Sequence, residues 1–460
     1  MRDGGALIPP HTTQRYAQRV SNASATTNTT ACSSIDDCSA NGECVAGVCV
    51  CDAAFTGKSC AVFNLLPLRP SEGEGYRRYE LGGSRVSSWC GAVLLGDDGK
   101  YHMWSSEMSN GAGIKAWNTN SQIVHAVADN PERPWDFKRQ GVVFEAWSHE
   151  PSVVRAPTGE YVMYFSSTVG HGPDENAFPC TGVLCPGKNG TSDASCPADE
   201  ACTLPKSAWG MKTKMSYAPT PYGPWSSPLV VPVPGSVHQD QNLACIIEQD
   251  GSAVCLGRVY LGRVVAKHWK DASTYATTPV EQLPSPPPSP SALVTAGSLH
   301  RPVDALRAMS NGEDPFLWKS RGVLHVVMHA AGVPPWGQPW GFHAWSHDRG
   351  ATWRLPGLQP TGAPFDAYGP RVEIEGQPPR VLSRRERPYV VLGPAGIPVA
   401  LSTAVTEGPC VMKPTNLPPP RAFAPDCPDD YCYTLVQPFV RQPDGAADTE
   451  HASGAGGVDG

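Results

Sequence analysis

Five segments of the chain share one pattern of apolar and polar positions. Each opens on a polar or aromatic residue, continues as an apolar run, turns at a glycine, and enters a second apolar run. The glycine follows the opening residue by 9 or 10 positions. The opening residues are Trp89, His149, Asn242, Glu313 and Glu386. Apolar runs on both sides of a glycine turn predict β-hairpins, and a first run without polar alternation predicts a strand buried between sheets.

A third apolar run follows several of these hairpins and ends in a turn with a tryptophan. It precedes Trp135, Trp225 and Trp353. The last copy, Ser-x-Asp-x-Gly-x-Thr-Trp over residues 346–353, resembles the Asp-box turn of propeller proteins. Five such units, 60 to 93 residues apart, predict an all-β fold, a five-bladed β-propeller over residues 76–440. A β-sandwich also contains many hairpins and is the alternative, which the regular glycine position disfavours.

Cysteines dominate the segment before the repeat. Residues 32–60 hold six of them in the spacing C-x5-C-x5-C-x4-C-x-C-x8-C. A segment this short has almost no core, so disulfides must stabilise it. The spacing, with Asn-Gly-Glu before the third cysteine and a glycine near the last, resembles an EGF-like module. That resemblance implies the disulfides Cys32–Cys44, Cys38–Cys49 and Cys51–Cys60.

Two roles for this module stay open from the sequence: it binds a protein partner, or it is a spacer. Calcium-binding EGF-like modules carry acidic residues just before the first cysteine, and here that place reads Thr29-Thr30-Ala31, so no calcium is expected. The polar segment 1–31 and the tail 441–460 are predicted to be disordered.

Ten cysteines lie outside the EGF-like segment. A three-residue loop places Cys245 opposite Cys255 on a hairpin, which predicts a cross-strand disulfide. Residues 171–206 hold four cysteines and are expected to form a stapled loop, and the proline-rich residues 284–290 an exposed excursion. Two more bridges are possible, with connectivity that the sequence does not give, among Cys90, Cys410, Cys427 and Cys432.

Composition indicates in which compartment the protein works and which classes of partner it could bind. Sixteen cysteines and Asn-X-Ser/Thr sequons at Asn22, Asn28 and Asn189 predict an extracellular or cell-surface protein. The start lacks an apolar signal-peptide core, so we expect an incomplete N-terminus or a lost signal. A net charge of −7 gives no basis for a nucleic-acid partner. No apolar stretch is long enough for a membrane span, and no motif predicts a cofactor or a metal.

The opening residues of the repeats carry the candidate chemistry. In a propeller the innermost strands converge on the axis, so these residues are expected to ring one mouth of the channel. An aromatic ring, an imidazole, an amide and carboxylates in one pocket suit a glycan. The residues that follow them in the chain are Cys90, Glu150, Leu243, Asp314 and Arg387.

The repeats resemble the blade starts of glycoside hydrolase family 43, the arabinanase and β-xylosidase family. The segments Gly99–Trp104, Glu313–Trp318 and Arg385–Pro388 carry the likeness, which spans about residues 76–440. The resemblance implies inverting hydrolysis, with Glu313 in the place of the general acid. The family's base would lie at Trp89-Cys90-Gly91 and its pKa-tuning aspartate at Gln241-Asn242, and neither place holds a carboxylate.

Three outcomes stay open because of this departure. A relocated base could be supplied by Glu386, Glu150 or Asp314. The reaction could differ in kind, or the domain could bind glycans without cutting them. We therefore name Glu313, Asp314 and Glu386 as catalytic candidates. The substrate-binding candidates are Trp89, His149, Glu150, Asn242 and Arg387. Each also has a structural alternative, such as an ion pair of Arg387 with a neighbouring carboxylate.

Overall fold

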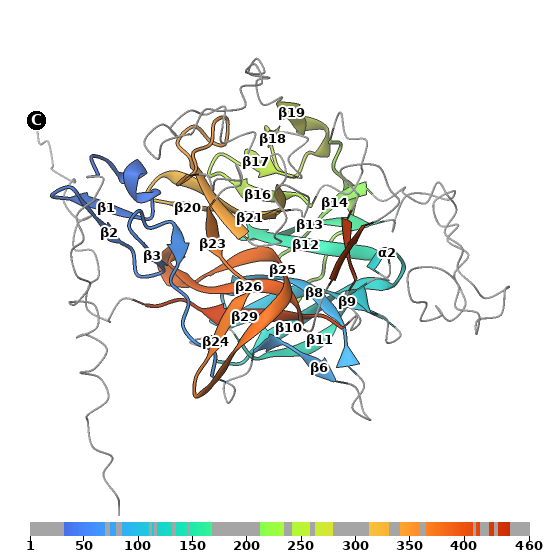
Figure 1. Ribbon diagram of the computed structural model, residues 1–460. Coiled ribbons are helices and arrows are strands. Elements are labelled where there is room, and N and C mark those ends of the chain that lie inside the picture. The colour runs from blue at the N-terminus through green and yellow to red at the C-terminus, as the bar shows by residue number, and fades with distance from the viewer. Residues whose placement is uncertain are drawn as a thin grey trace, which may run out of the picture.

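The computed structural model describes most of the chain (Figure 1). Expectations for residues 1–31, 171–206, 284–290 and 442–460, for the three sequons, and for Cys410 and Cys427 lie outside the described residues. The described residues are 32–69, 74–79, 85–109, 113–114, 117–130, 135–145, 147–167, 212–233, 242–257, 263–278, 312–330, 341–357, 365–407, 411–414, 423–426 and 431–441.

Five antiparallel sheets form the larger part of the molecule, and in each the strand nearest the centre begins a hairpin. Blade 1 comprises β8 (Ser88–Leu95), β9 (Tyr101–Met108), β10 (Ser121–Ala128) and β11 (Phe137–Phe144). Blade 2 comprises β12 (Ser148–Arg155), β13 (Tyr161–Ser167), β14 (Lys212–Ala218) and β15 (Leu229–Val230). Blade 3 comprises β16 (Ala244–Ile247), β17 (Ala253–Leu256), β18 (Arg263–Ala266) and β19 (Ala276–Thr278). Blade 4 comprises β20 (Gly312–Ser320), β21 (Val323–Ala330), β22 (Gly341–Ser346) and β23 (Asp366–Tyr368). Blade 5 comprises β24 (Arg371–Ile374), β25 (Gln377–Leu392), β26 (Pro398–Glu407), β29 (Tyr433–Pro438) and β5 (Gly75–Tyr76).

The inner strands of the five sheets form a closed ring. β8 contacts β12, β12 contacts β16, β16 contacts β20, β20 contacts β25, and β25 returns to β8. A sandwich of two sheets has no such cycle. The predicted five-bladed propeller is therefore confirmed, and the three strands expected in each blade are joined by a fourth that the sequence pattern did not show.

Blade 5 closes the ring with strands from both ends of the propeller. β5, from the N-terminal side, pairs with the C-terminal strand β29 through Tyr76 and Thr434. Gly75 lies so close to β29 that a Cβ there would come within 2.4 Å of the Thr434 carbonyl oxygen, and its φ is 109°. Only glycine satisfies both demands, so this residue is required for closure.

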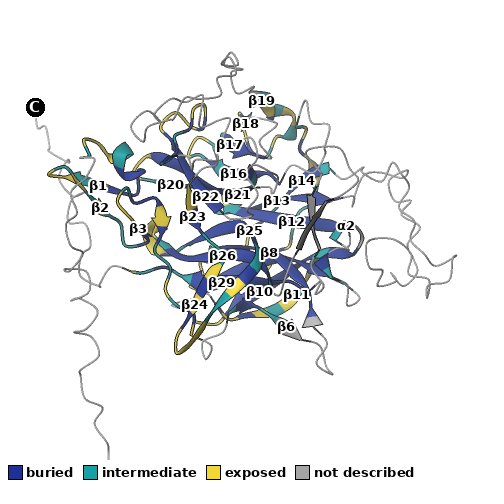
Figure 2. Cartoon of the chain, viewed as in Figure 1, coloured by how far each residue is buried: buried dark blue, intermediate teal, exposed yellow. Residues whose placement is uncertain are grey.

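The remaining elements are short. They are η1 (Ile35–Cys38), β1 (Gly42–Val45), β2 (Val48–Cys51), β3 (Phe55–Thr56), β4 (Val62–Phe63), β6 (Arg78–Tyr79), β7 (Arg85–Val86), α2 (Trp117–Asn120), η5 (Ala272–Thr274), η6 (Pro394–Gly396), β27 (Val411–Pro414) and β28 (Phe423–Asp426). None of the helices in the described part of the chain is long and apolar enough to cross a membrane. Buried strands concentrate in the blades, while exposed residues gather on hairpins such as β24–β25 (Figure 2).

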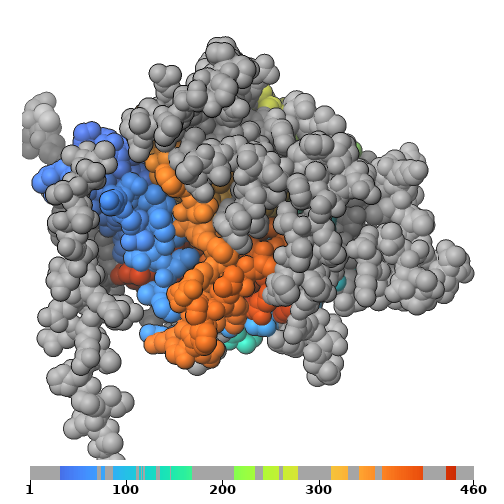
Figure 3. All heavy atoms as spheres, in the orientation of Figure 1, coloured from blue at the N-terminus to red at the C-terminus, as the bar shows by residue number. Residues whose placement is uncertain are grey.

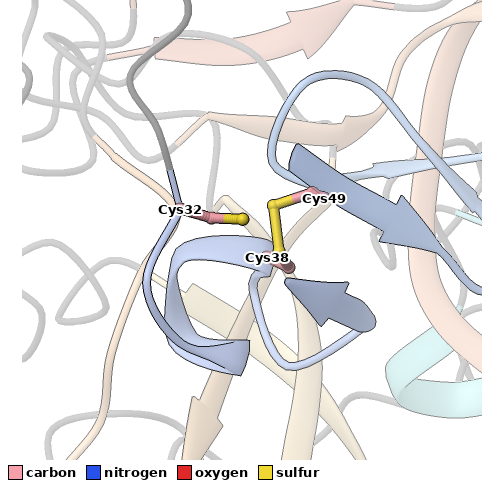
Figure 4. A group of neighbouring side chains, drawn as sticks. All are labelled: Cys32, Cys38 and Cys49. Carbon is pink, nitrogen blue, oxygen red and sulfur yellow. A yellow bond between two sulfur atoms is a disulfide. The ribbon is translucent and has the colours of Figure 1, made fainter. Parts of the chain in front are cut away.

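The N-terminal module is held by three disulfides, Cys32–Cys44, Cys38–Cys49 and Cys51–Cys60. Figure 4 shows the Cys38–Cys49 bond that ties η1 to β2, with the Cys32 sulfur beside it. Its second hairpin, β3 with β4, continues to Phe63. The bounds 32–60 for this module and 76–440 for the propeller remain predictions. In blade 3, Cys245 and Cys255 lie opposite each other and form a fourth disulfide.

The module packs on blades 4 and 5 (Figure 3). Asp36 accepts hydrogen bonds from Trp345 Nε1 and His347 Nε2, each at 2.7 Å, and pairs with Arg354. The Phe63 ring lies against Tyr368 of blade 4 and Phe439 next to blade 5. An interface with buried aromatic rings and a shared carboxylate holds the module in one position, which a freely moving spacer would not require.

Replacing Asp36 by Asn should loosen this contact. The variant keeps the size of the side chain, loses the ion pair with Arg354, and presents one oxygen where the carboxylate presents two. We expect a loss of about 1–3 kcal/mol in docking free energy, seen as faster amide hydrogen exchange in β22 and in η1. The control is Asp52→Asn, since Asp52 pairs with Arg321 at a more exposed place. Equal exchange rates in the two variants would contradict the assigned role of Asp36.

Blades 1 and 4 each contain a buried pair of stacked histidines. In blade 1, His102 Nδ1 and His125 Nε2 are 3.0 Å apart. In blade 4, His325 Nδ1 and His343 Nε2 are also 3.0 Å apart. Asn41 of the N-terminal module reaches the same pair, with its amide nitrogen 3.3 Å from His343 Nδ1. Such a hydrogen bond needs one nitrogen with a proton and one without, so neither pair can carry two charged rings.

Candidate functional site

Each inner strand begins with a residue in the left-handed backbone region. These residues, with φ between 45° and 59°, are Cys90, Glu150, Asn242, Asp314 and Arg387. Register shifts accompany them in blades 1, 2, 4 and 5, where the chain bulges at the start of the strand. The repeated bulge turns two consecutive side chains per blade toward the axial region, which we call the first position and the second position.

This geometry corrects the alignment of blade 3. Asn242 was expected to match Trp89, His149, Glu313 and Glu386 at the first position, with Leu243 beside it. Its left-handed φ of 45° places it at the second position instead. Counted from the second position, the turn glycine follows after 9, 9, 9, 8 and 9 residues. The residue before Asn242 lies outside the described part of the chain.

The second-position side chains form a buried ionic network centred on Arg387. Its Nη1 lies 2.7 Å from Asp314 Oδ1 and 3.1 Å from Glu150 Oε2. Its Nη2 donates to the Glu150 carbonyl oxygen at 3.1 Å, and Asn242 Nδ2 donates to Asp314. Arg387, Glu150, Asn242 and Asp314 all lie buried. Four blades are thus joined near the axis by one guanidinium and its acceptors.

Two ionisable groups of the second position are fixed in one protonation state. Burial by itself would raise the pKa of Glu150, but the Arg387 guanidinium beside it brings that pKa below its ordinary value. Burial raises the pKa of the Cys90 thiol to about 11, so it stays protonated at neutral pH. Glu150 is therefore a bound anion of the network, and Cys90 offers no thiolate in the place where the family 43 base would lie.

The first-position glutamates of blades 4 and 5 meet at His329 of β21. Glu313 Oε2 lies 3.8 Å from His329 Nε2, and Glu386 Oε2 lies 3.9 Å from the same nitrogen. The Glu313 side chain is 32% exposed, whereas His329 is 3% exposed. The two carboxylates therefore lie next to one imidazole at the axial mouth, and Glu313 is the more accessible of the two.

Glu386 also pairs with Arg384 of the same strand. Arg384 Nε and Nη2 contact the two carboxylate oxygens at 2.7 and 2.8 Å. The guanidinium lies over the Trp89 ring, 4.9 Å from its centroid. Trp89 is only 4% exposed, so it supports Arg384 rather than offering an open face to a sugar.

His149, at the first position of blade 2, belongs to the wall of the site. Its Nδ1 lies 2.6 Å from Ser121 Oγ, and its Nε2 lies 3.3 Å from Glu150 Oε1. Trp117 stacks on its ring at 5.2 Å. The ring is 2% exposed, so it is an anchored side chain that orients Glu150.

His329 and Arg384 were missed by the sequence reasoning. His329 lies opposite Glu313 in the β20–β21 register, and Arg384 is two residues before Glu386 on β25. Knowledge of the hairpin register would have found His329, because the residue opposite a first-position side chain lies on the same face. Neither residue belongs to a motif that could be read without that register.

Glu313, Asp314 and His329 also have ligand atoms within 4.8 Å of one another, close enough for one cation. The charge contacts of His329 with Asp314 at 3.2 Å and with Glu313 at 3.8 Å account for this grouping. Cys32, Cys38 and Cys49 form a second such group, but their sulfurs are engaged in disulfides. The absence of a metal or cofactor remains an expectation.

Comparisons with known proteins found similarities to the N-terminal module and to the propeller. Residues 35–62 match the model of a family described as Teneurin-like EGF domain. No curated protein matches the chain. A solved structure of a thermostable family-43 glycoside hydrolase is similar, at 13% identity and a TM-score of 0.40, over 77% of this chain and 89% of that one.

Two further solved structures are similar to the same extent. Zg3597, a family 117 glycoside hydrolase from Zobellia galactanivorans, has 13% identity and a TM-score of 0.40, over 85% of this chain and 91% of that one. The α-L-arabinofuranosidase PaAbf62A from Podospora anserina, in complex with cellotriose, has 12% identity and a TM-score of 0.41, over 80% and 95%. Likeness at this level carries no argument about the site, and the fold assignment rests on the sheet order and the ring of inner strands. The chain therefore joins an EGF-like module to a five-bladed β-propeller.

Proposed function

We propose that the axial mouth binds a glycan and hydrolyses a glycosidic bond, with Glu313 as general acid and Glu386 as general base. The observation that carries the proposal is the placement of both carboxylates within 4 Å of one His329 nitrogen. The two Oε2 atoms can be no further apart than the sum of those two distances. This upper limit admits the lower part of the range of roughly 6.5–9.5 Å in inverting glycosidases, and also the spacing of roughly 5–5.5 Å in retaining ones.

The surroundings support different roles for the two glutamates. Glu386 accepts hydrogen bonds from Arg384 on both oxygens, which holds its carboxylate in one orientation. Glu313 is the more exposed of the two, with 32% of its side chain accessible against 11% for Glu386. It is thus the better placed to protonate a leaving oxygen. Asp314 and Glu150 are bound to Arg387 and are assigned to the framework of the site.

Replacing Glu313 by Gln tests this assignment. We expect kcat/KM on a responsive chromogenic arabinoside, xyloside or galactoside to fall about 100- to 10,000-fold, with little change in glycan affinity, because the amide keeps the size and polarity of the acid. The control is Glu373→Gln, which alters an exposed ion pair with Arg371. Equal residual turnover in Glu313→Gln and the wild type would remove Glu313 from the mechanism.

A second candidate function is glycan binding without cleavage. The two hydrogen bonds from Arg384 favour it, because both oxygens of Glu386 are occupied and one would have to leave the guanidinium to bind a water molecule. A glycan array together with the glycoside panel separates the two. Binding without turnover supports this second function, whereas an array with no ligand and clear turnover contradicts it.

We further propose that the protein works outside the cell or at its surface. Four disulfides among the described residues and the predicted sequons support an oxidising compartment. A protein partner at the EGF-like module is part of the same proposal. Its β1–β2 hairpin exposes Val45, Val48 and Val50 by more than half.

A further inference from the structure

His329 occupies a position that other blades fill with small side chains. The residues opposite the first position on the second strand are Ser106 in blade 1, Ser166 in blade 2 and Ala404 in blade 5. Blade 4 alone, among these four described blades, has an imidazole there. A structural task common to the blades therefore does not account for the size of His329.

One nitrogen of His329 lies at the blade contact where a serine lies in blade 1. In blade 1, Ser106 Oγ accepts the backbone N–H of Glu150, the second-position residue of the next blade, at 2.8 Å. In blade 4, His329 Nδ1 faces the backbone N–H of Arg387, again the second-position residue of the next blade, at 3.5 Å. Nδ1 thus belongs to the contact between blades, and Nε2 is left to face Glu313 and Glu386.

The charge state of the ring decides what it donates. A hydrogen bond from the Arg387 N–H needs Nδ1 without a proton, whereas the 3.2 Å contact of Nδ1 with Asp314 Oδ2 needs a proton on it. We take Nδ1 as protonated, because the contact with Asp314 is the shorter of the two. We take the ring as charged, because three carboxylates surround it and together raise the pKa of His329 above its ordinary value, although burial opposes the charge.

We propose that His329 is a positioning residue whose charged ring attracts the carboxylates of Glu313 and Glu386 toward Nε2, so that they face one substrate bond together. The inference rests on the proposed function and goes beyond it, since it assigns the pairing of the two glutamates to a third residue. Arg384 pairs with Glu386, and Arg387 pairs with Asp314, so both carboxylates are also held by a guanidinium. Glu313 is the more exposed of the two glutamates and lies 3.8 Å from His329 Nε2.

Two substitutions separate the two nitrogens. An Asn at 329 places its amide near the Nδ1 position and can keep the contacts with Asp314 and the Arg387 N–H. A Gln places its amide near Nε2 and can keep the donor toward the glutamates. A purely structural residue would tolerate Asn better, and the proposed positioning residue should tolerate Gln better.

The expected result is a fall of about 100-fold in kcat/KM for His329→Asn, of the size typical for a lost acid–base contribution, with partial rescue in His329→Gln. The pH profile of His329→Asn should lose or shift its acidic limb, while thermal unfolding shows that both variants fold. Loss of activity in Gln equal to that in Asn, or greater, would overturn the proposal.

A second measurement does not need turnover. Carbon-13 labelling of glutamate carboxyls, with Glu313→Gln to assign the resonance, gives the titration midpoint of Glu313 by NMR. His329→Asn should shift this midpoint by more than His329→Gln does, and an equal or smaller shift overturns the proposal. If the wild type cleaves no glycoside but the midpoints differ as expected, hydrolysis fails as a function while the positioning role stands.

Discussion

Replacing Arg387 by Met should destabilise the propeller by about 3–5 kcal/mol, as expected when one partner of a buried ionic network is removed. Arg387 contacts Asp314 and Glu150, and all three are buried. Without the guanidinium, two carboxylates would remain close together in the interior with only the His329 and His149 rings beside them. Denaturation by guanidinium chloride, with the disulfides intact, measures the change in the free energy of unfolding.

Two controls locate this effect in the network. Adding Asp314→Asn to Arg387→Met should restore part of the stability, because one unpaired buried charge is removed. Arg371→Met breaks the pair with Glu373, whose side chains are more than half exposed, and should cost less than about 1 kcal/mol. Similar losses in Arg371→Met and Arg387→Met would show that the network does not hold the blades together.

Stability should also fall steeply as the pH drops from about 6.5 to 4.5. Burial lowers the pKa of His125 and of His325 to about 3, and it also lowers the pKa of His102 and His343. In this range the unfolded chain binds more protons at these histidines than the native state does. Each of them therefore removes up to about 1.4 kcal/mol per pH unit from the free energy of unfolding.

The pH range of this loss of stability and its direction can both be measured. His329, with its raised pKa, contributes stability that is fully present below about pH 6.5 and is lost only as the pH rises above it, so it does not offset the four histidines in this range. The carboxylates whose pKa is lowered, such as Asp36 and Asp98, lose their stabilising effect only at lower pH. His125→Gln should reduce the pH dependence by about one proton. A free energy of unfolding that stays constant between pH 6.5 and 4.5 would contradict the buried neutral state of these pairs.

The five-fold repeat in the sequence determines the propeller architecture. An apolar run interrupted by glycine at a fixed distance contains the information for a hairpin, because both the buried faces and the turn are local properties. The six cysteines of the module likewise specify a fold, since the number and spacing of crosslinks dominate so short a chain. For the same reason the residues from Trp89 to Arg387 at the strand starts could be expected near one axis.

Only the tertiary structure decided how those residues share the work. The left-handed backbone of Asn242 shows that it occupies the second position of its blade. This conformation belongs to a backbone bulge, which cannot be predicted from the type of amino acid. His329 belongs to the site because it pairs with Glu313 across two strands. Arg384 belongs to it because its side chain contacts Glu386, and no sequence motif marks either position. Closure of the ring by β5 and the docking of Asp36 on blade 4 also join residues hundreds of positions apart. Such pairings depend on the free energy of the whole packed ring, and no local segment contains it.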